Sequence, residues 1–109
     1  MWTVDHANII TAEQKSAERQ EATKKAFENA IQKHIDATAI QRLFRDGVTL
    51  ASYVASTNPQ WAAEAQAFVA WRDAVWAYAY AELEKVLTGQ RPQPTVEAFL
   101  SEIDPIVWP

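Results

Sequence analysis

The side chains that most often carry out chemistry are few in this sequence, and they form no catalytic or metal-binding pattern. His6 and His34 lie too far apart for the HExxH spacing that puts two zinc ligands on one helix face, and Asp5 beside His6 is only a weak pair of ligands. The two glycines, Gly47 and Gly89, cannot build a glycine-rich phosphate loop. None of the serines stands in a nucleophile elbow: they are Ser16, Ser52, Ser56 and Ser101. The sequence therefore predicts no enzyme, no catalytic residue, no metal site and no cofactor.

The composition narrows the class of protein further. The chain has 109 residues, of which 49% are hydrophobic, enough for one modest core. Its formal net charge of −4 argues against nucleic acid as a partner, because nucleic-acid binders usually present a basic surface. No stretch reaches the roughly 18 apolar residues of a membrane span, and the opening MWTVDHANII lacks the basic and apolar regions of a signal peptide. The absence of cysteine fits a reducing compartment.

A charged helix is the first element that we expect, after an extended segment over residues 1–10. Thr11 and Gln14 have the spacing of a capping box, so the helix should begin there. Acidic and basic residues alternate along it as far as Asn29, and it has almost no apolar stripe before Phe27. A helix that is polar all round packs loosely or projects from the body. We expect either a solvated helix or a partner-binding arm.

An apolar stripe begins at Phe27 and should carry the chain into the core. It continues through Ile31, Ile35, Ile40, Leu43 and Phe44. The residues RDG at 45–47 predict the end of this helix, with Gly47 in the left-handed conformation. A short helix with Val48, Ala51 and Val54 on one face should follow, with Thr49 as its cap.

A long helix is predicted from Asn58 and Pro59 to about Thr88, closed by Gly89. About 30 residues at 1.5 Å each give roughly 45 Å, which exceeds the diameter of a compact domain of this size. The helix should therefore span the whole body or project into a partner.

The C-terminal part, residues 89–109, should be a linker, a short helix and an apolar tail. QRPQP is stiff and extended, Thr95 can cap a helix through Glu102, and DPIVWP ends the chain in extended form. Such a tail docks on its own body or on a partner. Taken together, residues 1–109 predict one all-α domain: a long central helix packed with the charged N-terminal helix and short helices, and an extended C-terminal tail.

One side of the long helix carries a regular series of alanines. They are Ala63, Ala67, Ala70, Ala74, Ala77 and Ala81, in alternating steps of four and three. Small residues at heptad spacing let a second helix approach closely. We therefore predict a buried helix-packing seam, either inside the chain or in a homo-oligomer. The alternative is a solvated face, because alanine is also the best helix former.

The opposite side of the long helix is a wide apolar face rich in aromatic rings. Arg72 lies near its middle, with Phe68 four residues before and Trp76 four residues after. Its guanidinium could stack on these rings or meet a carboxylate from another helix or from a partner.

Three short motifs resemble the small tail-assembly chaperones and tail-fibre assembly proteins of tailed bacteriophages. They are ITAEQKSAE at residues 10–18, AFVAWRDAVW at 67–76 and DPIVWP at 104–109. The family motif carries over to Trp71, Arg72, Ile106, Trp108 and Pro109.

The resemblance implies a non-enzymatic protein that binds a phage tail or tail-fibre protein during virion assembly, in the host bacterial cytoplasm or with the virion. The partner-binding residues would be Trp71, Arg72, Trp76, Tyr80, Ile106 and Trp108, since aromatic and arginine side chains are typical interface anchors. Two alternatives remain open. The chain could be a structural subunit that stays in the particle through helix-mediated self-association, or a small inhibitor of a host protein.

Overall fold

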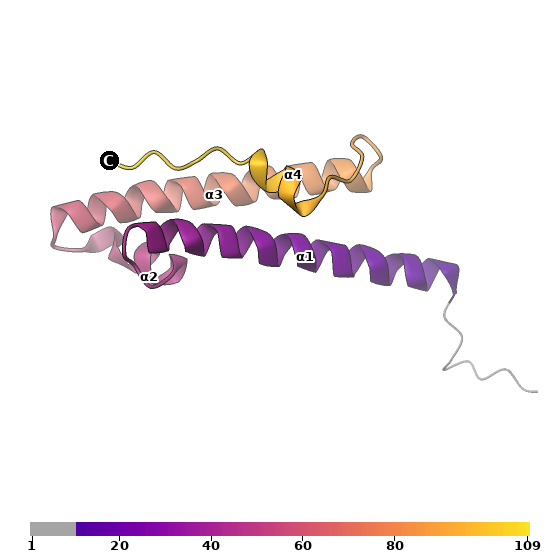
Figure 1. The fold of residues 1–109 in the computed structure, drawn as a ribbon, viewed down its shortest axis with the longest axis horizontal. Helices are drawn as coiled ribbons and strands as arrows, with labels where there is room; N and C mark the ends of the chain where they lie inside the picture. The colour runs from indigo at the N-terminus through magenta and orange to yellow at the C-terminus, as the bar shows by residue number, and fades with distance from the viewer. Residues whose placement is uncertain (1–10) are drawn as a thin grey trace, which may run out of the picture.

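The computed structural model describes residues 11–109 and folds them into a long antiparallel helical hairpin (Figure 1). Its elements are α1 (Ala12–Gln41), α2 (Gly47–Ala51), a 3-10 turn (Ser52–Ala55), α3 (Pro59–Leu87) and α4 (Val96–Ser101). Helices and turns account for all the regular structure of the described residues, which confirms the all-α prediction. The extended segment expected over residues 1–10 lies outside the described part of the chain.

The first half of α1 is an exposed arm. Thr11 forms the predicted capping box with Gln14: the Thr11 hydroxyl accepts from the Gln14 N–H at 3.1 Å, and the Gln14 side chain accepts from the Thr11 N–H at 3.0 Å. Every residue from Thr11 to Ala22 is exposed, and this end of α1 reaches past the rest of the molecule (Figure 1). The prediction of a polar helix that packs loosely or projects is therefore confirmed for this half.

The end of α1 differs from the prediction. The helix ends at Gln41, and Leu43, not Gly47, takes the left-handed conformation, with φ of 67°. The N–H of Leu43 donates to the Ile40 carbonyl at 2.9 Å, and that of Phe44 to the Ala39 carbonyl at 3.2 Å. These two bonds form the helix-ending Schellman motif, in which glycine usually occupies the left-handed position. The sequence signal failed because a leucine stands where the rule expects a glycine.

Gly47 instead begins α2 at a close approach between elements. Its N–H donates to Asp36 Oδ1 of α1 at 2.9 Å. A Cβ on this residue would lie 3.0 Å from Asp36 Oδ1 and 3.1 Å from the Phe68 ring. The cap of α2 is Asp46 rather than Thr49, because the Asp46 carboxylate accepts from the Thr49 N–H at 2.7 Å.

The core lies where α1, α2 and α3 meet, and it extends to α4. Its buried apolar residues are Ile31, Ile35, Ala39, Leu50, Ala65, Phe68, Val75, Ala79 and Phe99. The predicted stripe is confirmed at Ile31 and Ile35 but is wrong at Ile40 and Leu43, which are exposed. The expected face of the short helix is also wrong at Val48 and Val54, because Leu50 fills the core instead.

The caps of α3 follow the prediction, but the helix is not buried on both sides. The Asn58 carboxamide accepts from the Gln60 and Trp61 N–H groups, Pro59 opens the helix, and Gly89 follows its end with φ of 76°. Most of the alanine seam faces outward: Ala70, Ala74, Ala77 and Ala81 are exposed, and Ala63 and Ala67 are half-buried. Ala70, Ala74, Ala77 and Ala81 therefore form an open side of α3 within the part of the chain that the structure describes.

The C-terminal tail docks on its own body. After α4 the chain runs back along α3 in extended form (Figure 1). The Trp71 indole N–H donates to the Asp104 carbonyl at 2.8 Å, and the Arg42 guanidinium lies 4.7 Å from the centre of the Trp108 ring. Ile106 and Trp108 pack against the core, whereas Val107 between them points outward and is 86% exposed.

Candidate partner-binding groove

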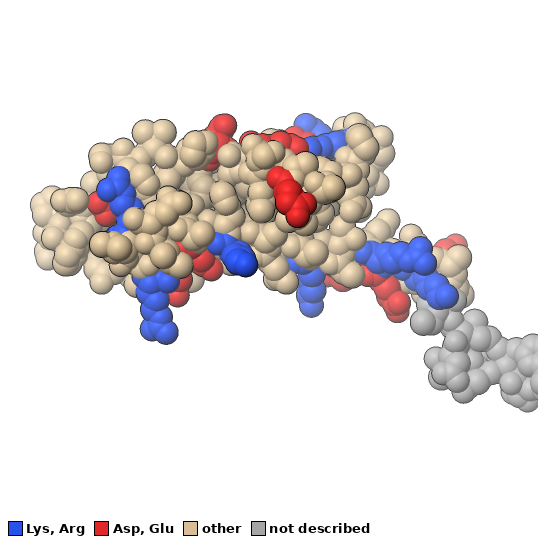
Figure 2. Space-filling view, in the orientation of Figure 1, with Lys and Arg blue, Asp and Glu red and all other residues tan. Residues whose placement is uncertain are grey.

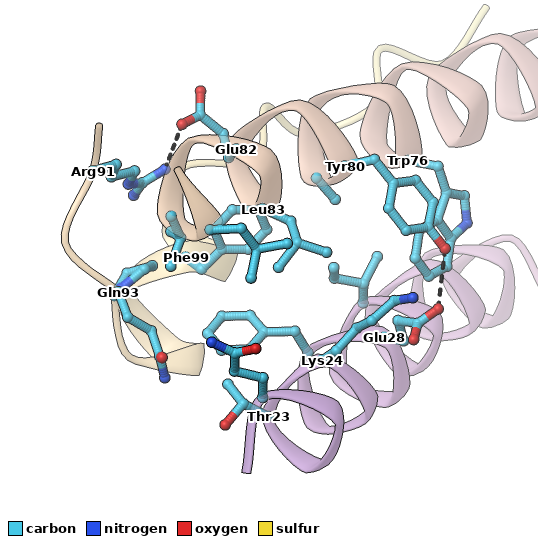
Figure 3. Close-up of a pocket in the computed structure, with 17 residues that line it drawn as sticks. Thr23, Lys24, Glu28, Trp76, Tyr80, Glu82, Leu83, Arg91, Gln93 and Phe99 are labelled. Atoms are coloured by element: carbon cyan, nitrogen blue, oxygen red, sulfur yellow. Dashed lines mark hydrogen bonds and ion pairs between the residues drawn. The ribbon is translucent and has the colours of Figure 1, made fainter. Parts of the chain in front are cut away.

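An open groove lies between α1 and α3, at the end of the molecule where α4 folds back. Its volume is about 290 Å³, and its three walls come from α1, α3 and the segment from the linker to α4 (Figure 3). The apolar residues that line it are Phe27, Ile31, Trp76, Ala79, Leu83, Val86, Leu87, Pro94 and Phe99. The exposed arm of α1 continues directly from one of its walls, because Gln20, Thr23 and Lys24 also line it.

Aromatic pairs set the shape of the groove. Trp76 and Tyr80, one turn apart on α3, stack with ring centres 5.7 Å apart. On the other side, the Phe27 ring of α1 meets the Phe99 ring of α4 edge to face, also at 5.7 Å. Rings held by such contacts have few free rotamers, so the apolar surface they offer is preorganised.

One hydrogen bond ties the two long helices together at the rim. Tyr80 Oη donates to Glu28 Oε2 at 3.0 Å, as the dashed line in Figure 3 shows. Because this bond favours the protonated phenol, it raises the pKa of Tyr80 above its ordinary value of 10.0. The nearby Lys24 forms no ion pair with any carboxylate of the described chain, so the rim offers one free cation.

A network of charged groups fixes the wall formed by the linker. Arg91 donates to Glu82 of α3 at 2.9 Å and also to Glu102, and Tyr78 Oη donates to the other oxygen of Glu102. The bonds from Lys85 and Arg91 lower the pKa of Glu82, and those from Arg91 and Tyr78 lower that of Glu102. The network therefore holds the linker and the end of α4 against α3.

Five of the six predicted partner-binding residues fall into two groups. Trp76 and Tyr80 line the groove, whereas Trp71, Ile106 and Trp108 are used within the chain to dock the tail.

Arg72 belongs to neither group. Its Nε and Nη2 both donate to the carboxylate of Asp73, the next residue, at 3.0 and 2.9 Å. The guanidinium therefore meets its own helix neighbour rather than the rings or the distant carboxylate that the sequence suggested.

Sequence reasoning missed the other walls of the groove. The sequence pattern places Phe27 in the core stripe, and Phe99 falls within the short helix expected after Thr95. Phe27 and Ile31 are four residues apart, which places them on the same face of a helix and indicates one wall of the groove. Nothing local in the sequence indicates that the linker turns back and places Phe99 opposite Phe27.

The charged side chains are distributed unevenly over the face of the molecule drawn in Figure 2. On the face drawn in Figure 2, most charged side chains lie along α1, and the rest of the body is mostly uncharged. Among residues 11–109, no cluster of three or more acidic or histidine side chains is placed to hold a metal ion. Within the same residues, no helix combines the length and apolarity needed to cross a bilayer.

Comparison of the chain with models of known protein families, with curated proteins and with solved structures finds no match. What the groove can bind therefore has to be inferred from its own residues.

Proposed function

We propose that this protein is a non-enzymatic assembly factor that binds an apolar segment of a phage tail or tail-fibre protein in the groove between α1 and α3. The observation that carries the proposal is the groove itself, an open apolar surface with preorganised rings and a mixed polar rim. The motifs that resemble tail-assembly chaperones, at residues 10–18, 67–76 and 104–109, supply the class of partner.

The composition of the groove favours a polypeptide as its occupant. Trp and Tyr are the residues that most often anchor protein interfaces, and Trp76 and Tyr80 stand together on its wall. The groove is open and lies between two helices, which is a geometry that can accept the apolar face of an amphipathic helix. The free ammonium of Lys24 at the rim would suit a partner carboxylate.

A second function has an observation of its own. The exposed alanines Ala70, Ala74, Ala77 and Ala81 leave one side of α3 smooth and nearly uncharged, and a helix of a second copy could approach it closely. In this alternative the chain is a structural subunit that stays in the phage particle through helix-mediated self-association.

The test is to express the tagged chain in its own phage or prophage background and identify every component of the purified complex by mass spectrometry. We expect a tail or tail-fibre protein that is absent from finished particles. Leu83→Glu, which puts a charge into the groove, should lose that partner, and Val107→Glu, at an exposed position outside the groove, should keep it.

Three other results would each contradict the proposal. Recovery of the chain within finished particles would favour the structural subunit. A host protein as the sole partner would favour the inhibitor. Retention of the tail protein by the Leu83→Glu variant would show that the groove is not its binding site.

A further inference from the structure

A second hollow, with mixed aromatic and polar walls, lies at the opposite end of the hairpin, where α1 turns into α2 and α3 begins. Its volume is about 650 Å³. Three rings form a continuous ladder along it: Phe44 meets Tyr53 at 5.3 Å and Tyr53 meets Trp61 at 5.8 Å, both edge to face. Trp61 at the end of the ladder is 47% exposed. No predicted binding residue lies here.

Leu43 lies on the rim of this hollow with an exposed apolar side chain and a left-handed backbone conformation. Its side chain is 96% exposed, so it contributes almost no packing within the described chain. Its backbone has φ of 67°, a conformation that disfavours every residue with a Cβ and that glycine fills easily. The Schellman motif at the end of α1 fixes this conformation, and it leaves an apolar side chain in solvent, where another molecule can contact it.

Two charged residues at the hollow have few ion-pair partners within the described chain. Arg45 forms no ion pair with any carboxylate of residues 11–109. Glu64 lines the hollow with its side chain only 8% exposed; it accepts a hydrogen bond from Gln60 Nε2 at 3.1 Å, and the Arg42 guanidinium lies 3.9 Å away. The same small surface therefore carries a protruding leucine, a hollow with partly aromatic walls, a cation with no partner among residues 11–109, and a carboxylate whose nearest cation is at the limit of an ion pair.

We propose that this end of the molecule binds a second copy of the chain. A surface that carries both a protrusion and a matching hollow can pair with itself across a twofold axis, because each element then meets its complement in the other copy. Leu43 of one copy enters the ring-lined hollow of the other, and Arg45 of one copy approaches Glu64 of the other. The resulting dimer leaves the groove at the far end of each copy open.

The experiment measures the mass of the purified chain by analytical ultracentrifugation over a range of concentrations, together with its melting temperature at the lowest of them. We expect a reversible monomer–dimer equilibrium. Leu43→Gly should raise the dissociation constant at least about tenfold, because it removes the anchor from both halves of the interface. The same variant should raise the melting temperature of the monomer by about 2–4 °C, because glycine relieves the left-handed strain.

Two further variants sharpen the result. Arg45→Glu should weaken the dimer by placing like charges opposite Glu64, and Val107→Ala, at an exposed apolar position elsewhere, should leave the dissociation constant unchanged. A wild-type chain that stays monomeric up to about 1 mM would overturn the proposal. So would a dimer that forms equally well with Leu43→Asp, because its interface would then lie on another face, such as the alanine seam.

Discussion

Two residues at the α1–α2 turn occupy positions where glycine is expected for two different reasons, backbone conformation and lack of space. Leu43 takes a left-handed conformation that suits glycine, and Gly47 takes an ordinary conformation at a place with no room for a side chain. Sequence rules assign glycine by conformation, so they placed the helix end at Gly47. The actual reason for that glycine is contact with Asp36 and Phe68, which are distant in sequence, and no local rule contains that information.

Gly47→Ala should destabilise the fold. The added Cβ would lie 3.0 Å from Asp36 Oδ1 and 3.1 Å from the buried Phe68 ring, so the start of α2 must move away from the core. We expect a loss of about 1–3 kcal/mol in the free energy of unfolding, measured by urea denaturation. Val48→Ala is the control: its side chain is 78% exposed, so its effect should stay within about 0.5 kcal/mol. Equal stability of the two variants would contradict the close approach.

At the scale of helices, the starts of α1, α3 and α4 could be predicted from the sequence, whereas the start of α2 and the tertiary neighbours of each helix could not. Thr11, Asn58 and Thr95 each cap the helix that follows, because a cap is a hydrogen bond between residues two or three apart. The burial of the alanine seam depends on which elements fold onto α3, and periodicity does not specify that. For the same reason the sequence places Trp76 and Tyr80 among the predicted partner-binding residues but does not indicate the wall that faces them across the groove.

The two faces of α3 can be compared with one pair of substitutions. Ala74→Leu adds volume on the exposed side and should change the free energy of unfolding by less than about 0.5 kcal/mol. Ala65→Leu adds the same volume at a fully buried position and should cost about 1–3 kcal/mol. Thermal unfolding of dilute protein measures both. A large loss from Ala74→Leu would mean that the seam is packed within the chain.

The docked tail should stabilise the fold mainly through the indole ring of Trp108. Trp108→Ala removes the indole that packs on the core and lies under the Arg42 guanidinium, at a cost of about 1–3 kcal/mol for a half-buried aromatic. Val107→Ala changes the outward-pointing neighbour and should have almost no effect. Denaturation and the rate of proteolytic cleavage after α4 measure the difference. If Trp108→Ala unfolds like the wild type, the tail is not held by this contact.

For the whole molecule, the charge network around Arg91 predicts how stability depends on pH. The hydrogen bonds lower the pKa of Glu82 and Glu102 below their ordinary value of 4.5, so the folded chain binds protons less readily than the unfolded chain. This stabilisation is fully present above the ordinary value. It is lost as the pH falls below 4.5 and then passes the lowered pKa values that Glu82 and Glu102 have in the folded chain.

Arg91→Met should therefore flatten the dependence of melting temperature on pH between about pH 6 and about pH 3, because it removes a cation that both carboxylates share. The control is Arg19→Met on the exposed arm of α1, where the described chain forms no ion pair. Parallel curves for the wild type and Arg91→Met would exclude the network as a source of pH sensitivity.

The position of the tail after α3 and α4 in the chain fixes the order in which parts of the fold can form. Ile103, Ile106 and Trp108 follow in the chain every residue that they cover. The tail can therefore dock only after α1 and α3 have formed the surface that receives it, and at synthesis rates of about 5–20 residues per second it is the last part of the described chain to be made. Until it docks, the chain exposes an apolar strip that the finished fold conceals. A factor that meets the chain before docking therefore finds a different surface from one that meets it afterwards.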